Sequence, residues 1–230
     1  MKYNEQEMND LSYKYALKYD KRTYCEYYLS LLITQHNLLF SFYYDKDYNS
    51  KIIKINLFFI SFIIDFTINA LFFNDDTMHK IYEDKGKFQF LYQLPQIIYS
   101  SLISSAINIP LKLLALSNND ILELKKKKKK KHLNKKSKVL NKKLRLKFIL
   151  YFLISSILLL LFWYYLAIFC AIYINTQKHL ITDTLISFGL SLLYPFGIYL
   201  IPGIFRIPSL SNKNKERKCL YKISKIFQMV

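Results

Sequence analysis

The segment FILYFLISSILLLLFWYYLAIFCAIYI, residues Phe148–Ile174, contains 27 consecutive residues without a charged side chain. At about 1.5 Å of rise per residue, a helix of this length exceeds the thickness of a bilayer's hydrocarbon core, which is about 30 Å. A helix that is apolar on every side is unusual in a soluble protein. We therefore predict that residues 148–174 form a transmembrane helix. Trp163, Tyr164 and Tyr165 lie near its middle, so we expect them to pack against other helices rather than to mark the membrane interface.

A second charge-free run, residues 185–205, follows after the short polar link of residues 175–184. The two runs predict a hairpin of transmembrane helices. Pro195 and Pro202 interrupt the second arm together with two glycines, and such interruptions are tolerated in a membrane only where protein or a cavity satisfies the freed backbone groups.

Two more segments, earlier in the chain, are long enough to cross a bilayer. Residues 88–116 contain the sequence SSLISS, whose small residues recur four apart and favour close helix packing. Residues 52–73 carry only two charged side chains: Lys54, which we expect to extend to the interface, and Asp65 well inside. We predict a transmembrane helix over each segment.

The N-terminal part is less clearly a membrane segment. Residues 1–26 mix five basic with five acidic side chains and are predicted to be cytoplasmic or interfacial. In residues 27–44, the polar triplet Gln35-His36-Asn37 interrupts an apolar stretch, so this segment is either re-entrant or a fifth span.

Basic residues are concentrated between and after these segments, and the chain as a whole carries a formal charge of +18. Residues 117–147 hold 14 basic and 2 acidic side chains, and residues 206–230 hold 7 and 1. The segments 74–87 and 175–184 are nearly neutral. Because short loops rich in Lys and Arg stay in the cytoplasm, the lysine-rich loop 117–147 and the C-terminal tail are both predicted to be cytoplasmic.

The lysine run in this loop has two interpretations. It is either a solvated orientation signal, or a surface that binds the headgroups of anionic lipids. Nucleic acid is not expected as a partner, because no stacking aromatic positions accompany the charge. The candidate headgroup contacts are Lys125, Lys126, Lys127, Lys128, Lys129, Lys130 and Lys131.

The C-terminal sequence KCLYKISKIFQMV predicts an amphipathic helix. Its apolar and basic residues fall on separate stripes, as in a helix that lies in the membrane interface. A soluble partner helix could use the same apolar stripe. That stripe consists of Leu220, Ile223, Phe227 and Val230, and the basic one of Lys218, Lys222 and Lys225.

Sequence patterns for catalysis, metal binding or cofactor binding are absent. The sequence has no HExxH or GxSxG pattern, no CxxC spacing, only four scattered glycines and four isolated histidines. We therefore expect neither an enzyme nor a cofactor.

Asp65 requires an explanation, since a carboxylate in an apolar span costs several kcal/mol unless it is paired, protonated or hydrated. Asn69 lies one turn further along the same face. One interpretation is that a hydrogen bond inside the bundle neutralises Asp65, with His36 and Asn108 as candidate partners. The other is a proton or cation site, formed with the helix broken at Pro195 and Pro202.

Several phrases of the sequence carry a resemblance to a known family. They are similar to the C-terminal membrane region of very large surface proteins of protists, ciliates in particular. The likeness covers most of the chain outside the lysine-rich loop. The phrases are KYDKRTYCEYY, DYNSKIIKI, INALFFNDDTMHKIYEDKGKFQFLYQLPQIIYS, LFWYYLAIFCAIYINTQKHLITDTLISFGLSLLYPFGIYLIPGIFRIPSL and KCLYKISKI.

The resemblance implies a membrane anchor for a large extracellular portion, with a short cytoplasmic tail and no enzymatic chemistry. This chain lacks such a portion, so we expect either a fragment or a free-standing copy whose partner is another chain.

Together these observations predict an all-α, multi-pass transmembrane bundle of four spans, with residues 27–44 as an open fifth and an interfacial C-terminal helix. The expected partners are the lipid bilayer, including anionic lipids, and other membrane helices. The expected role is a non-enzymatic anchor or assembly module. A channel or transporter subunit that uses Asp65 and a polybasic lipid tether are the alternatives.

Overall fold

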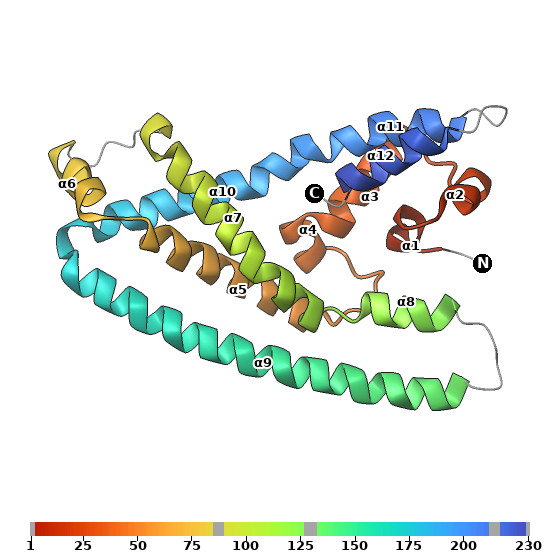
Figure 1. Ribbon diagram of the computed structural model, residues 1–230, viewed down its shortest axis with the longest axis horizontal. Helices are drawn as coiled ribbons and strands as arrows, with labels where there is room; N and C mark the ends of the chain where they lie inside the picture. The colour runs from red at the N-terminus through yellow and green to blue at the C-terminus, as the bar shows by residue number, and fades with distance from the viewer. Residues whose placement is uncertain (1–2, 85–89, 127–132, 212–216, 229–230) are drawn as a thin grey trace. The chain divides into compact units, whose positions relative to one another are not determined.

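The computed structural model describes residues 3–84, 90–126, 133–211 and 217–228, and within these ranges every regular element is a helix (Figure 1). The helices are α1 (Glu5–Asn9), α2 (Tyr13–Tyr19), α3 (Tyr24–Gln35), α4 (Asn37–Phe42), α5 (Lys51–Leu71), α6 (Asp75–Glu83), α7 (Phe90–Ala115), α8 (Asn118–Lys126), α9 (Leu133–Ile172), the short 3₁₀ helix η2 (Ile174–Thr176), α10 (Gln177–Ile198), α11 (Leu200–Ser211) and α12 (Lys218–Gln228).

Four helical segments are long and apolar enough to cross a membrane. This confirms the prediction of an all-α membrane protein with four spans, and each span lies where an apolar run was identified. The segments are Lys51–Leu71, Leu94–Ala115, Lys136–Ile172 and Gln177–Ser211.

The chain divides into two compact units. The first, here called the terminal unit, contains residues 1–51 and 192–230. The second, here called the bundle unit, contains residues 52–191.

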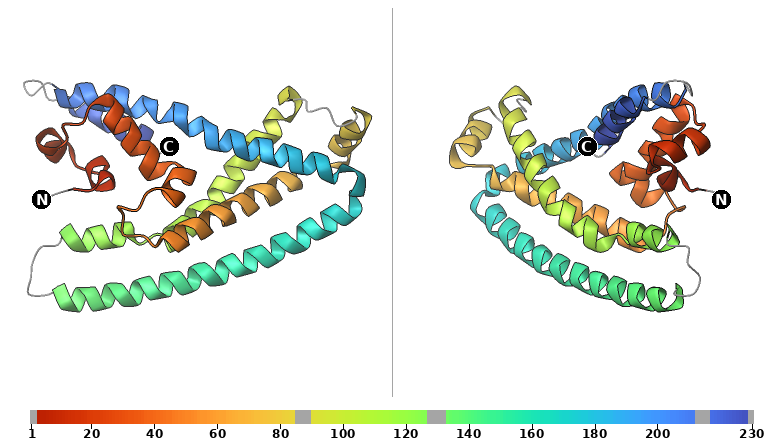
Figure 2. Two further views of the ribbon diagram at one scale, coloured as in Figure 1. Left: turned by 180° about the vertical axis from the view of Figure 1, so that it is seen from behind. Right: turned by 45° about the vertical axis from the view of Figure 1, so that its right-hand side comes forward.

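The bundle unit is organised around α5. Its buried isoleucines and leucine recur three or four residues apart, which places them on one face of the helix. Near the start of α5 this face packs against Leu111 and Ala115 of α7 and Tyr151 of α9. At the other end, Ala70 packs with Phe169 of α9. Helix α7 therefore runs antiparallel to α5, which it crosses in Figures 1 and 2, whereas α9 runs parallel to α5. The buried face of α5 consists of Ile53, Leu57, Ile60, Ile64 and Ile68.

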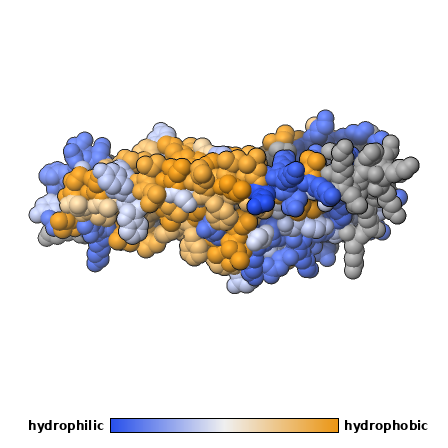
Figure 3. Space-filling model, turned by 90° about the horizontal axis from the view of Figure 1, so that it is seen from below, coloured by the Kyte–Doolittle hydropathy of each residue, from blue (hydrophilic) through white to orange (hydrophobic). Residues whose placement is uncertain are grey.

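Helix α9 is longer than the predicted span. Its 40 residues begin at Leu133, so much of the lysine-rich segment predicted as a loop is helical. The physical reason is that Lys, Leu and Arg all favour helix. Figure 3 shows a hydrophobic surface along α9 that becomes hydrophilic at its lysine-rich end.

Of the three aromatic residues near the middle of the α9 span, only Tyr165 packs as expected: its hydroxyl donates to the carbonyl oxygen of Ala70 at 3.4 Å. Trp163 is 78% exposed and Tyr164 is 68% exposed, so the described helices do not cover either of them. Lys54 of α5 also differs from expectation, because it is 1% exposed rather than extended to the surface.

The predicted span over residues 185–205 is part of a longer helical segment. Helix α10 already begins at Gln177, so only η2 separates it from α9. A break at Tyr199 separates α10 from α11. Pro202 lies in the first turn of α11, where its missing N–H costs no helical hydrogen bond.

In the terminal unit, residues 27–44 do not form one continuous helix. His36 ends α3 and begins α4, and its Nε2 lies 2.8 Å from the carbonyl oxygen of Leu192. The two helices have 12 and 6 residues, about 18 and 9 Å, so neither alone crosses a hydrocarbon core. The re-entrant or interfacial interpretation of this segment stays a prediction.

Helix α12 packs within the terminal unit. Its buried face consists of Tyr221, Ser224 and Gln228, and the ring of Phe227 stacks on that of Phe205 in α11 at 5.7 Å. The apolar stripe identified in the sequence is therefore partly used inside the chain; Val230 lies outside the described residues.

Gly203 of α11 lies close to Tyr24 of α3. A Cβ at this position would lie 2.6 Å from the ring of Tyr24, whose hydroxyl donates a hydrogen bond to the carbonyl oxygen of Leu200 at 2.7 Å. Gly189 and Gly197, in contrast, have open space where a Cβ would be.

We predict that Gly203→Ala destabilises the terminal unit by about 1–3 kcal/mol, because the Tyr24 ring has to move and its hydrogen bond is strained. Gly197→Ala is the matched control and should be neutral or slightly stabilising, since Ala favours helix. Denaturant unfolding of the chain in detergent measures both, and equal effects of the two substitutions would contradict the packing described here.

Candidate functional site

Three polar residues of α5 recur four apart on one face of the helix: Ser61, Asp65 and Asn69. Ser61 and Asn69 are buried at 2% exposure each, and Asp65 is half-buried. They form a polar row inside a membrane-spanning helix. Such groups need partners within the protein, because the hydrocarbon offers none.

The partners come from a matching polar row on α7, whose members also recur four apart. The Ser61 hydroxyl donates to Oδ1 of Asn108 at 3.0 Å, and Nε2 of Gln96 donates to Oδ1 of Asn69 at 3.1 Å. Residue numbers therefore rise along α5 as they fall along α7, so the two helices are antiparallel. The α7 row consists of Gln96, Ser100, Ser104, Asn108 and Lys112.

Asn69 also connects α5 to α10. Its Nδ2 donates to the hydroxyl of Thr184 at 3.0 Å, and Thr184 is 1% exposed. One amide side chain therefore joins three spans, since Gln96 contacts the same group from α7.

Asp65 lies beside Ser104 and within Coulombic reach of Lys112. A carboxylate and an ammonium group in one membrane region offset each other's charge, which lowers the cost of burying either. The arrangement therefore agrees with the interpretation that groups inside the bundle neutralise Asp65. Lys112 is a neighbour that this interpretation did not include.

The two expected partners of Asp65 have other contacts in this structure, so their pairing with Asp65 stays a prediction. Asn108 accepts from Ser61, and His36 lies in the terminal unit beside Leu192. Lys112 was missed because it follows the charge-free run directly and was treated as its boundary. The signal that identifies it is the spacing of four residues from Asn108 and eight from Ser104. The broken helix around Pro202 belongs to the terminal unit, so its cooperation with Asp65 stays a prediction.

The lysine-rich segment is organised by one acidic residue. Asp120 of α8 accepts from Nζ of Lys143 and Nζ of Lys147, both at 2.7 Å, which joins α8 to the start of α9. Burial acts to raise the pKa of Asp120, but these hydrogen bonds and charges outweigh it and lower the pKa below its ordinary value. Of the candidate headgroup contacts, Lys125 and Lys126 lie in α8, and Lys127–Lys131 lie outside the described residues.

A buried charge cluster in the terminal unit was not predicted at all. Arg206 of α11 is fully buried, and its Nε and Nη2 donate to Oδ2 of Asp20 at 3.0 and 2.8 Å. Arg22 donates to both carboxylate oxygens of the same Asp20, at 2.8 and 2.9 Å. The guanidinium of Arg206 also lies against the rings of Tyr27 and Tyr221, at 4.7 and 5.0 Å from their centroids.

The remaining donors of Arg206 reach backbone carbonyl groups. They donate to the oxygens of Met8 at 2.9 Å and Asn9 at 3.2 Å, at the end of α1. A buried arginine with several hydrogen bonds and a carboxylate partner is stable, whereas one without them is strongly unfavourable. Arg206 therefore fixes α1 and α11 to each other. In the sequence it is the only charge between Leu185 and Leu210, and it had been assigned to the basic tail.

The cluster changes the acidity of its members. Burial acts to raise the pKa of Asp20, but the hydrogen bond from Arg22 and the charges of both arginines outweigh it and lower the pKa below its ordinary value. Burial raises the pKa of Tyr221 to about 12, so its phenol is neutral and donates to the carbonyl oxygen of Leu11 at 2.6 Å.

Among the described residues, no three His, Cys, Asp or Glu side chains gather in a way that could hold a metal ion. Comparison of the chain with protein-family models, curated proteins and solved structures gives no match.

We predict that acid destabilises the terminal unit through Asp20. A lowered carboxyl pKa means that the cluster contributes its full stability above about pH 4, the ordinary range for Asp, and loses it as the pH falls through the lower folded pKa. Asp20→Asn should cost about 3–5 kcal/mol at pH 7, because it leaves the buried Arg206 without its carboxylate, whereas Arg22 keeps its ion pair with Glu5. It should also weaken the loss of stability that acid causes.

The measurement is unfolding in detergent between pH 7 and pH 2.5. Asp10→Asn is the matched control, since Asp10 has a half-exposed side chain, and it should change stability by less than about 1 kcal/mol. Equal losses from the two substitutions would contradict the role assigned to Asp20.

We further predict that Asp65 and Lys112 are energetically coupled. Asp65→Asn or Lys112→Gln alone leaves one charge in the membrane without its neighbour, so the double variant should lose less stability than the two single losses combined, with a coupling of about 0.5–3 kcal/mol. Lys138→Gln, on the exposed start of α9, is the control partner and should be additive with Asp65→Asn. Additivity in both pairs would refute the coupling.

Proposed function

We propose that this membrane protein is a non-enzymatic anchor or assembly module: a helical bundle that holds a folded terminal unit at the membrane. The observation that carries the proposal is the contrast between its spans. In the apolar 18-residue stretch that defines the α5 span, 56% is buried inside the chain. In the corresponding stretch of α9, only 11% is buried. The surface of α9 is thus largely apolar, while Ser61 and Asn69 in the polar row of α5 are hydrogen-bonded to neighbours within the bundle.

The exposed aromatic residues of α9 support an assembly role. Trp163 and Tyr164 lie near the middle of the span and are largely exposed. Trp and Tyr that contact lipid usually lie at the interface, where their polar atoms meet water. Their position near the middle therefore favours helices of other chains as their partners in the membrane.

The distribution of charge supports an orientation in which the lysine-rich segment and the C-terminal tail face the cytoplasm. Both are strongly basic, and the positive-inside rule applies to short segments next to spans. The resemblance to the membrane region of large protist surface proteins agrees with anchoring. In this proposal the bilayer and other membrane helices are the partners, and nucleic acid is not.

A channel or transporter subunit is the second candidate function. It is favoured by one observation: Asp65, an ionisable residue within a span, is not fully buried and lies close to Ser104 and Lys112 of α7. Intramembrane ionisable residues of this kind often mark ion pathways. A lipid tether through Lys125–Lys131 is a third, and Ser substitutions at these positions would remove its binding to anionic liposomes.

Replacing both charges with apolar residues separates the first two functions. The variant Asp65→Leu/Lys112→Leu keeps the bundle neutral, so an anchor should tolerate it: we expect unchanged retention in membranes washed with alkaline carbonate, and no ion flux from the wild-type chain in liposomes. A wild-type flux that the double variant abolishes would instead establish the channel.

A further inference from the structure

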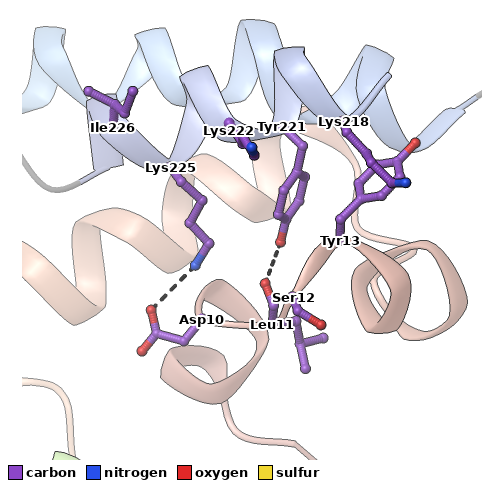
Figure 4. Close-up of a pocket in the computed structure, with 9 residues that line it drawn as sticks. All are labelled: Asp10, Leu11, Ser12, Tyr13, Lys218, Tyr221, Lys222, Lys225 and Ile226. Atoms are coloured by element: carbon purple, nitrogen blue, oxygen red, sulfur yellow. Dashed lines mark hydrogen bonds and ion pairs between the residues drawn. The ribbon is translucent and has the colours of Figure 1, made fainter. Parts of the chain in front are cut away.

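A groove of about 560 Å³ lies in the terminal unit between α12 and the connection from α1 to α2 (Figure 4). This volume is in the usual range of small-molecule sites. Its nine lining residues are Asp10, Leu11, Ser12, Tyr13, Lys218, Tyr221, Lys222, Lys225 and Ile226.

The groove has a net positive charge, because three lysines line it against one aspartate. Lys225 contacts that aspartate: its Nζ lies 3.5 Å from Oδ1 of Asp10 and donates to the carbonyl oxygen of Asn9 at 2.6 Å. Lys225 therefore offsets the single negative charge. The two other lysines, Lys218 and Lys222, are exposed and lie four residues apart, on one face of α12.

The rest of the lining is largely apolar. Ile226 is 63% exposed, and Leu11, Tyr13 and Tyr221 also line the groove. The two rings contact each other with centroids 5.4 Å apart. Ser12 adds a hydroxyl that does not cap α2. A ligand that fits these surfaces has an anionic group and an apolar part next to it.

The position of the groove in the chain favours a lipid. Helix α12 packs on α11, and α11 is the last part of the candidate span Gln177–Ser211. This segment has 35 residues, more than the about 20 that cross a hydrocarbon core, so we expect its last turns to reach the headgroup region. A groove beside these turns meets phospholipid headgroups at a high local concentration.

We propose that the groove between α12 and the α1–α2 connection binds the headgroup of an anionic phospholipid. The phosphate lies on Lys218 and Lys222, and the glycerol and first acyl carbons lie on Ile226, Leu11 and the tyrosine rings. The site is separate from the lysine run at residues 125–131 and from the apolar stripe of α12. It goes beyond the proposed anchoring role, because a chain that conducts ions could carry the same groove.

The test is a titration of the purified full chain in neutral detergent with dioctanoyl phosphatidylglycerol, followed by native mass spectrometry or thermophoresis. We expect saturable binding that Lys218→Ser/Lys222→Ser weakens about 30-fold, since each basic residue near an anionic surface contributes about 1 kcal/mol. Lys138→Ser/Lys142→Ser removes the same charge from the exposed start of α9 and should leave the affinity unchanged.

Three further binding measurements test whether the ligand is an anionic phospholipid. Dioctanoyl phosphatidylcholine should bind at least 10-fold more weakly, because its headgroup has no net charge. Glycerol phosphate alone should also bind more weakly, and Ile226→Ser should weaken the lipid but not glycerol phosphate. Equal binding of phosphatidylcholine, equal binding of glycerol phosphate, or an unaffected Lys218→Ser/Lys222→Ser variant would each overturn the proposal. If the chain inserts into membranes but gives one of these results, the groove is not a lipid site and the proposed anchoring role is unaffected.

Discussion

The absence of water in the hydrocarbon core is the constraint on which the rest of the structure depends. Long apolar helices are stable there only if every polar group they carry finds a partner inside the protein. Helix α5 shows the consequence: its isoleucine face forms the core of the bundle unit, and its polar row meets the polar row of α7. The hydrogen bonds of Asn69 then connect three spans through one side chain.

In the terminal unit, the group that needs partners inside the protein is a buried charge. Arg206 is a full charge at the end of an apolar helical segment, and it is stable because Asp20, two carbonyl groups and two aromatic rings surround it. This cluster joins segments nearly two hundred positions apart in the sequence. One of its rings, Tyr221, also lines the groove beside Lys218 and Lys222.

The sequence was sufficient to predict the transmembrane spans, which depend on composition. It was not sufficient to predict contacts between side chains that lie far apart in the chain. Runs such as residues 148–174 identify spans directly, because length and the absence of charge are sufficient. The extension of α9 to Leu133 was missed because lysines were interpreted as loop residues, although they favour helix. Arg206 and Lys112 were missed because each borders an apolar run, and no local pattern identifies a partner such as Asp20, 186 positions away.

The central claim is that four helices cross a membrane and place both basic segments on one side. The most direct measurement is labelling of single cysteines in sealed, oriented vesicles with a maleimide that does not cross the bilayer, in a background without Cys25 and Cys170. The account predicts that the native Cys219 and, in chains without it, Lys142→Cys react from the same side, and that Tyr82→Cys in α6 reacts only from the other. Reaction of Tyr82→Cys from the same side as Lys142→Cys would contradict it.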